Sequence, residues 1–371
     1  MIYKEFGNTG KKVSALGFGC MRLPEITIDG QKRVDENKSK AILRRAVELG
    51  INYFDTGYFY GNGMSEEVLG DALLDIRKKI YISTKCHASY VNRSGDLRRI
   101  LGEQLERLKT GYIDFYHLHG LRFSTYIETE KKYGWHKELQ EARDQGLITH
   151  LSFSTHDTPE NTKKIIDLGI FETMLCQFNL IDRSNEDVMA YAASKGLGVA
   201  VMGPLGGGRI PEMPGELSAK TRNNVETAFR FVFSNPNVDC VLSGMSDPVE
   251  LEENVRIALK SQALSPSELS DINALMEQRK KLADLYCTGC SYCLPCPVGV
   301  DIPTIFSCVN YVNVYGMKQY AKKKYLEIGQ GPDGKKKRAD ACIGCGKCEK
   351  KCPQNIEIRK QLIEANNMLK F

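Results

Sequence analysis

Short apolar runs alternate with amphipathic stretches along about the first 260 residues of the chain. The apolar runs have the length of buried strands, and the amphipathic stretches repeat their apolar positions every three to four residues, as helices do. The predicted strands cover residues 13–19, 51–55, 80–85, 113–118, 151–154, 173–179, 197–202 and 238–243. The predicted helices that follow them cover residues 38–49, 65–74, 96–108, 135–145, 159–168, 185–195, 225–234 and 251–259.

Eight strand–helix repeats in succession are typical of an α/β fold in which parallel strands close into a (β/α)8 barrel, the TIM barrel. The alternative is a doubly wound open sheet. That fold binds dinucleotides through a Gly-x-Gly-x-x-Gly turn after its first strand, and residues 17–22, Gly-Phe-Gly-Cys-Met-Arg, lack the last glycine. The pattern therefore favours the barrel.

In such a barrel the catalytic groups lie where strands end and loops begin. Asp55 ends the second predicted strand, and Tyr60 follows in a glycine-rich loop before Ser65, which is expected to cap the next helix. Lys85 ends the third predicted strand, and His119 directly follows the fourth. A single strand-end Lys or His is more often structural than catalytic. Four chemically compatible groups on three successive strands predict a catalytic site.

These four groups fit the chemistry of carbonyl reduction. A tyrosine with an ordinary pKa of about 10 is a poor acid at neutral pH unless its phenolate is stabilised. The ammonium of Lys85 can stabilise that phenolate, and Asp55 can keep Lys85 charged and oriented. His119 can hydrogen-bond the alkoxide that develops on the substrate oxygen. We therefore expect Tyr60 to be the proton donor or acceptor.

The composition is that of a globular protein with a sizeable core, with 42% hydrophobic and 26% charged residues over 371 positions. No apolar run reaches the roughly 20 residues of a membrane span. The first residues also lack the basic and apolar regions of a signal peptide. These features predict a cytoplasmic protein without membrane contact that keeps its cysteines reduced.

The 13 cysteines are distributed very unevenly. Four are scattered through the first 286 residues and are expected to pack as small apolar side chains; these are Cys20, Cys86, Cys176 and Cys240. The other nine fall between residues 287 and 352. Eight of these nine form two runs, Cys287-x2-Cys290-x2-Cys293-x2-Cys296-Pro and Cys342-x2-Cys345-x2-Cys348-x3-Cys352-Pro. The ninth, Cys308, is expected to be a packed helix residue.

Two such runs favour two 4Fe-4S clusters of the ferredoxin kind over a zinc ribbon, which Cys-x2-Cys pairs alone would also allow. In two-cluster ferredoxins the fourth cysteine of each run ligates the other cluster. The first cluster is then expected on Cys287, Cys290, Cys293 and Cys352, and the second on Cys342, Cys345, Cys348 and Cys296. The first run has two rather than three residues before its fourth cysteine, so a single cluster on the second run is the alternative.

The sequence thus divides into a barrel over residues 1–270, a linker helix over 271–286 and an iron–sulfur domain over 287–371. Residues 302–325 have helical composition, so the last domain is expected to be small and mainly α-helical. It carries 14 Lys and Arg against 7 Asp and Glu. A basic surface of this kind can attract an acidic electron carrier such as ferredoxin or flavodoxin, and the alternative is a solvated lysine-rich face. No basic helix interleaved with aromatic residues points to nucleic acid.

Three segments resemble the aldo-keto reductase superfamily, in the subgroup with a C-terminal 4Fe-4S domain. They are Asp55-Thr-Gly-x-x-Tyr60-Gly with Ser65-Glu66 and Leu69-Gly70, then Ser83-Thr84-Lys85, then Asp114-Phe-Tyr-His-Leu-His119. The resemblance covers about residues 1–270 and implies that Asp55, Tyr60, Lys85 and His119 form a catalytic tetrad. His117 is expected on the other face of its strand. The cysteine-rich domain resembles the helical dicluster domains of succinate dehydrogenase-type subunits.

The resemblance also implies a nicotinamide cofactor along the rim of the barrel. The matching positions, from the nicotinamide to the adenosine end, are Ser154, Thr155, Gln177, Met202, Gly203, Pro204, Leu205, Gly206, Gly244, Glu250, Glu253 and Asn254. Met202 stands where many relatives stack an aromatic ring. Gly244 and Glu250 stand where relatives that prefer NADPH place a Lys and an Arg. Because an acidic side chain repels a 2′-phosphate and accepts from ribose hydroxyls, NADH is favoured over NADPH.

The expected function is the interconversion of a small-molecule carbonyl and an alcohol by hydride transfer, coupled to electron transfer through the clusters. A nicotinamide passes two electrons as hydride, whereas each cluster passes one. A flavin would reconcile the two, but no flavin motif stands out. Two alternatives are open: the clusters are structural or regulatory, or the barrel is a non-catalytic nucleotide sensor. The loops at residues 120–133 and 209–222 are expected to line the substrate pocket.

Overall fold

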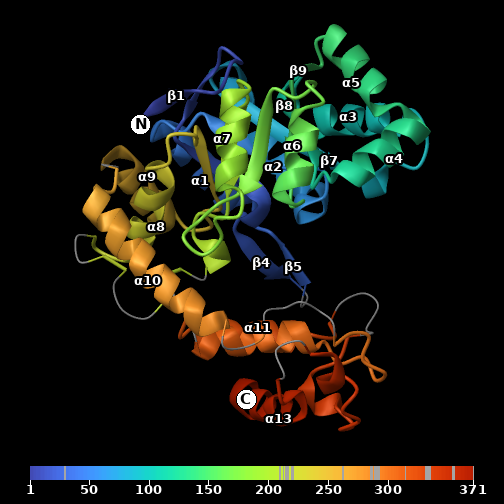
Figure 1. Cartoon of the computed structure of the whole chain (residues 1–371). Helices are drawn as coiled ribbons and strands as arrows, with labels where there is room; N and C mark the ends of the chain where they lie inside the picture. Colours follow the sequence, from blue (N-terminus) through green and yellow to red (C-terminus); the bar gives the residue numbers. More distant parts are fainter. Residues whose placement is uncertain are drawn as a thin grey trace. The chain divides into compact units, whose positions relative to one another are not determined.

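The structure is a computed structural model that describes residues 1–28, 31–208, 210–211, 213, 217–218, 221–260, 263–284, 287, 293–313, 315–330, 336–352 and 356–370. The chain divides into two compact units, whose elements are labelled in Figure 1. The first comprises Met1–Gly206 and Ala228–Leu264, and the second comprises Gly207–Thr227 and Ser265–Phe371. Each unit has its own hydrophobic core.

The first unit contains a closed barrel of eight strands, and all neighbouring strands in it are parallel (Figure 1). The predicted (β/α)8 barrel is therefore confirmed, and the open sheet is excluded. The strands are β3 (Leu16–Gly19), β6 (Tyr53–Asp55), β7 (Tyr81–His87), β8 (Ile113–His119), β9 (Ile148–Ser154), β10 (Thr173–Gln177), β11 (Gly198–Met202) and β12 (Cys240–Ser243). Each predicted strand overlaps one of them, because a parallel sheet buried on both faces leaves short, continuous apolar runs in the sequence.

Helices follow the barrel strands at the expected places. They are α1 (Glu36–Glu48), α2 (Met64–Leu73), α3 (Asp96–Arg107), α5 (Trp135–Asp144), α6 (Pro159–Ile166), α7 (Glu186–Ser194), α8 (Asn224–Phe233) and α9 (Pro248–Lys260). At the start of α1 the side chain of Asp35 accepts from the N–H of Lys38. At the start of α6 Thr158 accepts from the N–H of Asn161, with a proline in the first turn. Both helices were predicted from their apolar periodicity, and these caps show where each one begins.

Three features differ from the prediction. The expected first strand is split: β2 (Lys12–Ser14) pairs antiparallel with β1 (Tyr3–Glu5), and only β3 enters the barrel. A hairpin of β4 (Glu25–Ile28) and β5 (Gln31–Val34) was missed, because β4 is exposed along its length and has no buried apolar face. Residues expected as a pocket loop form the helix α4 (Phe123–Tyr133).

Aromatic side chains close the amino end of the barrel. The ring of Phe6 lies edge-on to Tyr53 at 5.5 Å and to Phe115 at 5.1 Å between ring centres. It also lies against Gly198, the first residue of β11, where a Cβ atom would come within 2.5 Å of the ring. Because this end is filled, the carboxyl end of the strands is the side at which a substrate can enter.

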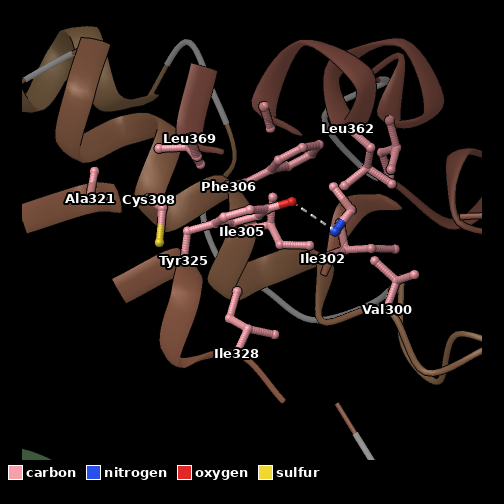
Figure 2. Packing of buried hydrophobic residues seen from close by; sticks show 13 residues of the cluster. Val300, Ile302, Ile305, Phe306, Cys308, Ala321, Tyr325, Ile328, Leu362 and Leu369 are labelled. Carbon is pink, nitrogen blue, oxygen red and sulfur yellow. Dashed lines mark hydrogen bonds between the residues drawn. The ribbon is translucent and has the colours of Figure 1, made fainter. Parts of the chain in front are cut away.

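Helices make up much of the described part of the second unit. They are α10 (Pro266–Asp284), α11 (Ile302–Asn313), α12 (Lys318–Glu327) and α13 (Ile358–Leu369). The last three pack around a core that includes Phe306, Cys308, Tyr325 and Leu362 (Figure 2). The Tyr325 hydroxyl accepts from the N–H of Ala339 at 3.2 Å and donates to α13 at 2.8 Å.

Cys308 is 1% exposed in this core and is a packed helix residue, as expected. The predicted linker helix starts within α10, and its last two residues, 285 and 286, lie outside the described residues. None of the helices in the described ranges is both long and apolar enough to cross a membrane.

Candidate active site and metal centres

Three neighbouring strands bring the predicted tetrad together at the carboxyl end of the barrel. Asp55 ends β6, Lys85 lies in β7, and His119 ends β8. The Nζ atom of Lys85 donates to Oδ1 of Asp55 and to the backbone oxygen of Thr56, each at 2.5 Å. The same atom lies 4.9 Å from the centre of the Tyr60 ring. The acidic and basic groups are therefore hydrogen-bonded to each other, and the tyrosine ring lies beside the ammonium group.

Lys85 is a buried cation with 1% of its surface exposed. Burial alone lowers the pKa of its ammonium group, but the Asp55 carboxylate and the Tyr60 phenol raise it, and the net pKa lies above the ordinary value. The Ser83 hydroxyl donates to the oxygen of Asp55 that Lys85 does not use. Lys85 therefore stays charged inside the barrel.

Tyr60 begins the short turn that leads from β6 to α2. Burial raises the pKa of its phenol, and this effect outweighs the lowering by Lys85. The predicted influence of Lys85 on Tyr60 thus has the expected direction, but the net shift is upward. Tyr60 is protonated at neutral pH and can act as an acid.

His119 borders the same space. Its ring lies edge-on to Tyr60 at 5.8 Å between ring centres and stacks on Phe59 at 5.2 Å, with 6° between the planes. Burial, with a smaller effect from Lys85, lowers the pKa of His119 to about 3. The imidazole is therefore neutral at neutral pH. Its buried Nδ1 has no hydrogen-bond partner among the described residues.

The expectation that His117 faces away from this group is wrong. Side chains two residues apart on a strand share a face, so His117 and His119 point to the same side of β8. His117 pairs in register with Lys85 and is fully buried. Burial, followed by the charge of Lys85, lowers its pKa to about 3. His117 is a neutral side chain inside the barrel.

Ser65 is not the helix cap that the sequence predicts. The residue before α2 is Gly63, with a φ of 91° that favours glycine. The hydroxyl of Ser65 donates to the backbone oxygen of Cys20 at 2.9 Å and shares a 2.8 Å hydrogen bond with the hydroxyl of Thr56. Ser65 thus ties the loop after β6 to the turn after β3.

The residues predicted to contact the nicotinamide follow on the next strands. Ser154 ends β9, and Gln177 and Met202 are paired in register at the ends of β10 and β11. Ser154 Oγ accepts a backbone N–H from the loop after β8 at 2.9 Å, and the hydroxyl of Thr155 donates to that loop at 2.9 Å. The Gln177 amide donates to Asp182 at 3.2 Å. These groups share the rim with the tetrad, and the side chains of Ser154, Thr155 and Gln177 each form a hydrogen bond to a neighbouring loop.

The predicted pyrophosphate segment is a tight turn after β11, made of Gly203, Pro204, Leu205 and Gly206. Both glycines have positive φ, and the N–H of Gly206 donates to the oxygen of Gly203 at 2.8 Å. The turn leads into the predicted pocket loop, of which residues 209, 212, 214–216, 219 and 220 lie outside the described residues.

At the adenosine end, three predicted residues have partners within the chain. Glu250 accepts from the N–H of Ser246 at 2.9 Å. Glu253 forms an ion pair with Arg256, three residues further along the same helix α9, at 3.8 Å. The Asn254 amide donates to the hydroxyl of the last residue of β12 at 3.3 Å. Asn254 is 4% exposed, so it holds the end of β12 rather than presenting its amide to solvent.

Gly244, the fourth predicted residue at this end, lies beside Arg22. A Cβ atom on Gly244 would come within 3.4 Å of the Arg22 side chain. Arg22 is not among the predicted site residues, because it belongs to the turn after β3 and lies beside Gly244 only through the pairing of β3 with β12.

Two cavities in the second unit are lined by the cysteines of both runs. One is lined by Cys293, Cys296, Cys342, Cys345 and Cys348. The other is lined by Cys287, Cys293 and Cys352 together with four apolar residues, Ile302, Phe306, Ile356 and Ile358. Cys290 lies outside the described residues. In the described ranges, no three His, Cys, Asp or Glu side chains converge as the ligands of a single ion.

The first cavity is lined by the last cysteine of the first run and by the first three cysteines of the second run. The second cavity is lined by the last cysteine of the second run and by the two described cysteines among the first three of the first run. This is the grouping that two-cluster ferredoxins use. Thiols in a largely apolar surrounding are suitable donors for iron–sulfur clusters. The two ligand sets remain predictions, and the cavities support them.

Comparison with known families follows the same division of the chain. Residues 15–226, more than half of the sequence, match the Aldo/keto reductase family. The chain belongs to the aldo/keto reductase family. Residues 286–357 match the 4Fe-4S dicluster domain, so this oxidoreductase has a 4Fe-4S dicluster domain C-terminal to its barrel in the sequence.

Similar proteins occur in plants and bacteria. L-galactose dehydrogenase from Arabidopsis thaliana is 30% identical over 314 residues, covering 75% of this chain and 95% of that protein. The uncharacterized oxidoreductase YqkF from Bacillus subtilis is 26% identical over 314 residues, covering 75% and 97%. Among solved structures, the holo form of aldo-keto reductase AKR11C1 from Bacillus halodurans has a TM-score of 0.63 and 25% identity, covering 74% of this chain and 96% of that one.

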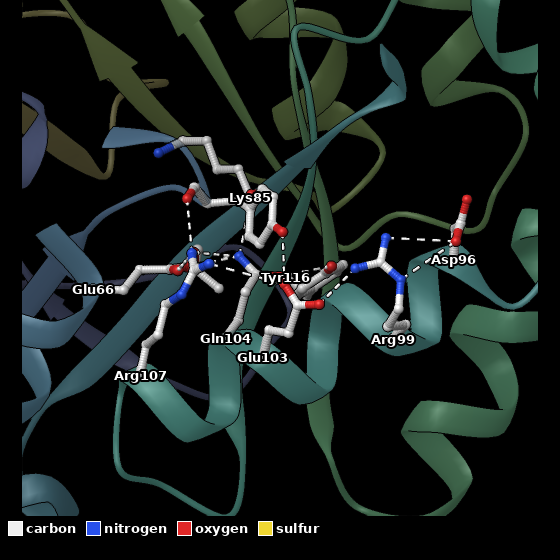
Figure 3. A network of polar contacts seen from close by, with 10 residues as sticks. Glu66, Lys85, Asp96, Arg99, Glu103, Gln104, Arg107 and Tyr116 are labelled. Carbon is white, nitrogen blue, oxygen red and sulfur yellow. Dashed lines mark hydrogen bonds and ion pairs between the residues drawn. The ribbon is translucent and has the colours of Figure 1, made fainter. Parts of the chain in front are cut away.

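A buried polar network supports the Lys85 strand of this aldo/keto reductase (Figure 3). The side-chain amide of Gln104, in α3, donates to the backbone oxygen of Lys85 at 3.2 Å. It also contacts Glu66 of α2 at 2.7 Å and Thr84 of β7 at 2.9 Å. Tyr116 of β8 donates to the oxygen of Gln104 at 2.9 Å. Two helices and two barrel strands are thus joined directly behind the predicted catalytic lysine.

Arg107 connects this network to the loop that carries Tyr60. Its guanidinium donates to Glu66 at 3.2 Å and to the backbone oxygen of Tyr58 at 3.0 Å. The N–H of Tyr58 in turn donates to the oxygen of Lys85 at 3.1 Å. Glu66 is fully buried, and burial raises its pKa against the lowering by its hydrogen-bond donors. In the sequence Glu66 stands out only as part of a family motif, because its partners lie far away along the chain.

We predict that Arg107→Met lowers kcat for carbonyl reduction about 10- to 100-fold with little change in cofactor affinity. The variant loses the donor to the Tyr58 oxygen and leaves Glu66 without its counter-ion, and displacing a catalytic group by about 1 Å can cost about 100-fold. Steady-state kinetics and a fluorescence titration of the cofactor measure both quantities. Arg99→Met, on the same helix, removes ion pairs with Asp96 and Glu103 at the exposed end of the network (Figure 3). Equal losses of kcat in the two variants would contradict the prediction.

A second prediction concerns Cys296, the fourth cysteine of the first run. Cys296→Ser is expected to reduce the iron content to about half, because it removes one ligand of a single cluster and leaves the other ligand set intact. Iron and acid-labile sulfide per chain, together with EPR of the reduced protein, provide the measurement. Cys308→Ser is the control, since Cys308 packs in the core. Full iron content in Cys296→Ser would show that Cys296 is not a ligand.

Proposed function

We propose that this aldo/keto reductase interconverts a small-molecule carbonyl and an alcohol by hydride transfer with a nicotinamide cofactor, and that it exchanges electrons through two 4Fe-4S clusters. The observation that carries the catalytic part is the buried pair of Lys85 and Asp55 beside a protonated Tyr60. An acid, the cation that tunes it and a neutral imidazole lie together at the open end of the barrel.

The nicotinamide, when bound, supplies the hydride to the carbonyl carbon. Tyr60 gives its proton to the carbonyl oxygen, so the product gains one hydride and one proton and becomes an alcohol. Lys85 stabilises the phenolate that remains, and Asp55 keeps Lys85 charged. Neutral His119 hydrogen-bonds the carbonyl oxygen and orients it. For alcohol oxidation the same phenolate accepts the proton.

The strand ends from β9 to β12 fit the cofactor. Ser154, Thr155 and Gln177 have the donors and acceptors that a carboxamide needs, and Met202 offers an apolar surface to its ring. The glycine turn after β11 lets the backbone approach a pyrophosphate closely. At the adenosine end Glu250 favours NADH, since a carboxylate repels a 2′-phosphate, and Arg22 adds a cation for the pyrophosphate or ribose side.

The clusters add single-electron chemistry to a reaction that moves two electrons as hydride. The cysteine cavities share Cys293 and Ile302, so the two sites are adjacent and can act in series. An acidic one-electron carrier, ferredoxin or flavodoxin, is the proposed partner, because the second unit is rich in lysine. A flavin remains without a supporting motif.

Replacing Tyr60 by Phe is expected to lower kcat at least about 100-fold while cofactor affinity stays unchanged, because only the transferable proton is lost. In the unaltered enzyme, carbonyl reduction should be independent of pH around neutrality and should fall as the pH passes the raised pKa of Tyr60. Alcohol oxidation should rise over the same range, since it needs the phenolate. Rates with a panel of small aldehydes and ketones test this, with Tyr90→Phe as a control at the same rim. Undiminished turnover in Tyr60→Phe would exclude Tyr60 as the acid.

Coupling between the two units is tested by an anaerobic titration. We expect about eight irons per chain and a brown absorbance that bleaches on addition of NADH, and less readily with NADPH. Eight irons without bleaching would mean that the clusters serve a separate partner or the fold. The barrel would then be an ordinary carbonyl reductase.

A further inference from the structure

One cysteine of the second run lies at the surface. Among the described cysteines, Cys345 is the exposed one; the others are buried or partly buried. Ile343 lines the same cavity as Cys345 and is 65% exposed. The wall of this cavity therefore opens to solvent, and a cluster ligand is accessible from outside.

Positive charge is concentrated beside this opening. Residues 336–352 include six Lys and Arg against two Asp and Glu. Lys347 and Lys351 line the cavity, and Lys350 is exposed next to Lys351. No ion pair is described for these three lysines within 336–352 or the other described ranges. The acid among them, Glu349, is engaged by Arg359 at 2.8 Å.

The same ion pair connects the second cysteine run to the start of α13. The guanidinium of Arg359, at the start of α13, donates to Glu349 at 2.9 Å and to the backbone oxygen of Gly344 at 3.4 Å. The N–H of Arg359 also donates to Glu349 at 2.9 Å. The cysteine loop is thus held against α13, so that little ordering is needed when a partner binds.

The second cavity has a different surrounding. Its described lining, besides cysteines, is apolar and includes no Lys or Arg. It shares Cys293 and Ile302 with the first cavity. Of the two cavities, the cavity of Cys345 is therefore the one that offers positive charge to an outside partner.

We propose that Ile343, Cys345, Lys347, Lys350 and Lys351 form a docking site, the Cys345 face, for a small acidic protein that carries single electrons. The inference rests on the proposed function in that it assigns the iron–sulfur domain an electron-transfer role. In the step that docking permits, the carrier loses one electron and the cluster site beside Cys345 gains one, with no bond formed or broken and no proton moved. The reverse direction has the same balance.

The chemistry of the face selects this occupant. An exposed isoleucine accompanied by lysines is complementary to a protein surface that combines an apolar contact with Asp and Glu side chains. A nucleic acid would need a longer basic track with stacking side chains, and an anionic membrane would need an amphipathic face. Lysines at the rim act chiefly by steering the approach of a charged partner.

The test measures binding of an oxidised acidic 2Fe-2S ferredoxin to the anaerobic holoprotein at low and at moderate ionic strength. Lys347→Glu, Lys350→Glu and Lys351→Glu together are expected to weaken binding at low salt at least about tenfold and to flatten its salt dependence. The triple change to Gln should have an intermediate effect. Iron and sulfide contents equal to those of the unaltered protein show that the site is still loaded.

The matched control replaces Lys78, Lys79 and Lys131 by Glu. These lysines lie on the barrel unit, are exposed and give the same change in net charge. Binding that is equal in the two triple variants would overturn the proposal, since net charge alone would then explain the effect. Wild-type protein that binds duplex DNA or anionic vesicles but not the ferredoxin would overturn it as well.

Failure of the docking site and failure of the proposed function are distinguishable. Bleaching by NADH requires no contact at the Cys345 face, so it reports on coupling inside the chain. Ferredoxin binding that depends on the three lysines, without bleaching by NADH, would leave the docking site standing and remove only the coupling. Bleaching by NADH without lysine-dependent ferredoxin binding would support the coupling inside the chain and overturn the docking site.

Discussion

The interaction on which the site depends is the buried hydrogen-bonded pair of Lys85 and Asp55. A lone ammonium in the interior of a barrel is too costly to keep charged, and a lone carboxylate is equally unfavourable. When the two are paired, each charge is balanced by the other, and the Lys85 ammonium also donates a hydrogen bond to the backbone oxygen of Thr56. Within the pair, the charge of Lys85 lowers the pKa of Tyr60, against the larger upward effect of burial, while Asp55 raises it. Lys85 also adds to the lowering of the His119 pKa, so that this imidazole stays neutral.

A pair of this kind is useful only if its geometry is fixed, and the fixing groups come from the outer layer of the barrel. Gln104 and Arg107 of α3, with Glu66 of α2, hold the backbone of Lys85 and of Tyr58 from behind. Glu66 is itself a buried charge whose donors come from different elements. The arrangement means that the packing of two helices determines the position of the proposed acid. Stability and proposed catalysis are therefore linked through one network.

In the second unit, the helical core brings together cysteines that lie far apart in the sequence. Its cysteines must approach one another from two distant runs, and the helices α11, α12 and α13 supply the apolar core that brings these runs together. The two cavities share a wall but differ in their surroundings, one apolar and one flanked by lysines. This asymmetry in charge is the physical basis for proposing that an external partner binds beside the cavity that the lysines flank.

The sequence by itself determined the barrel, the four rim residues and the two cysteine runs. Each of these is encoded locally: a parallel strand is an apolar run, and cysteine spacing is read directly. Only the tertiary structure decided which groups meet. Ser65 bonds across to Cys20 instead of capping its helix, His117 shares a face with His119, and Arg22 reaches Gly244. These contacts join residues far apart in the chain, and the pKa of Tyr60 depends on burial, so neither can be read from a linear pattern.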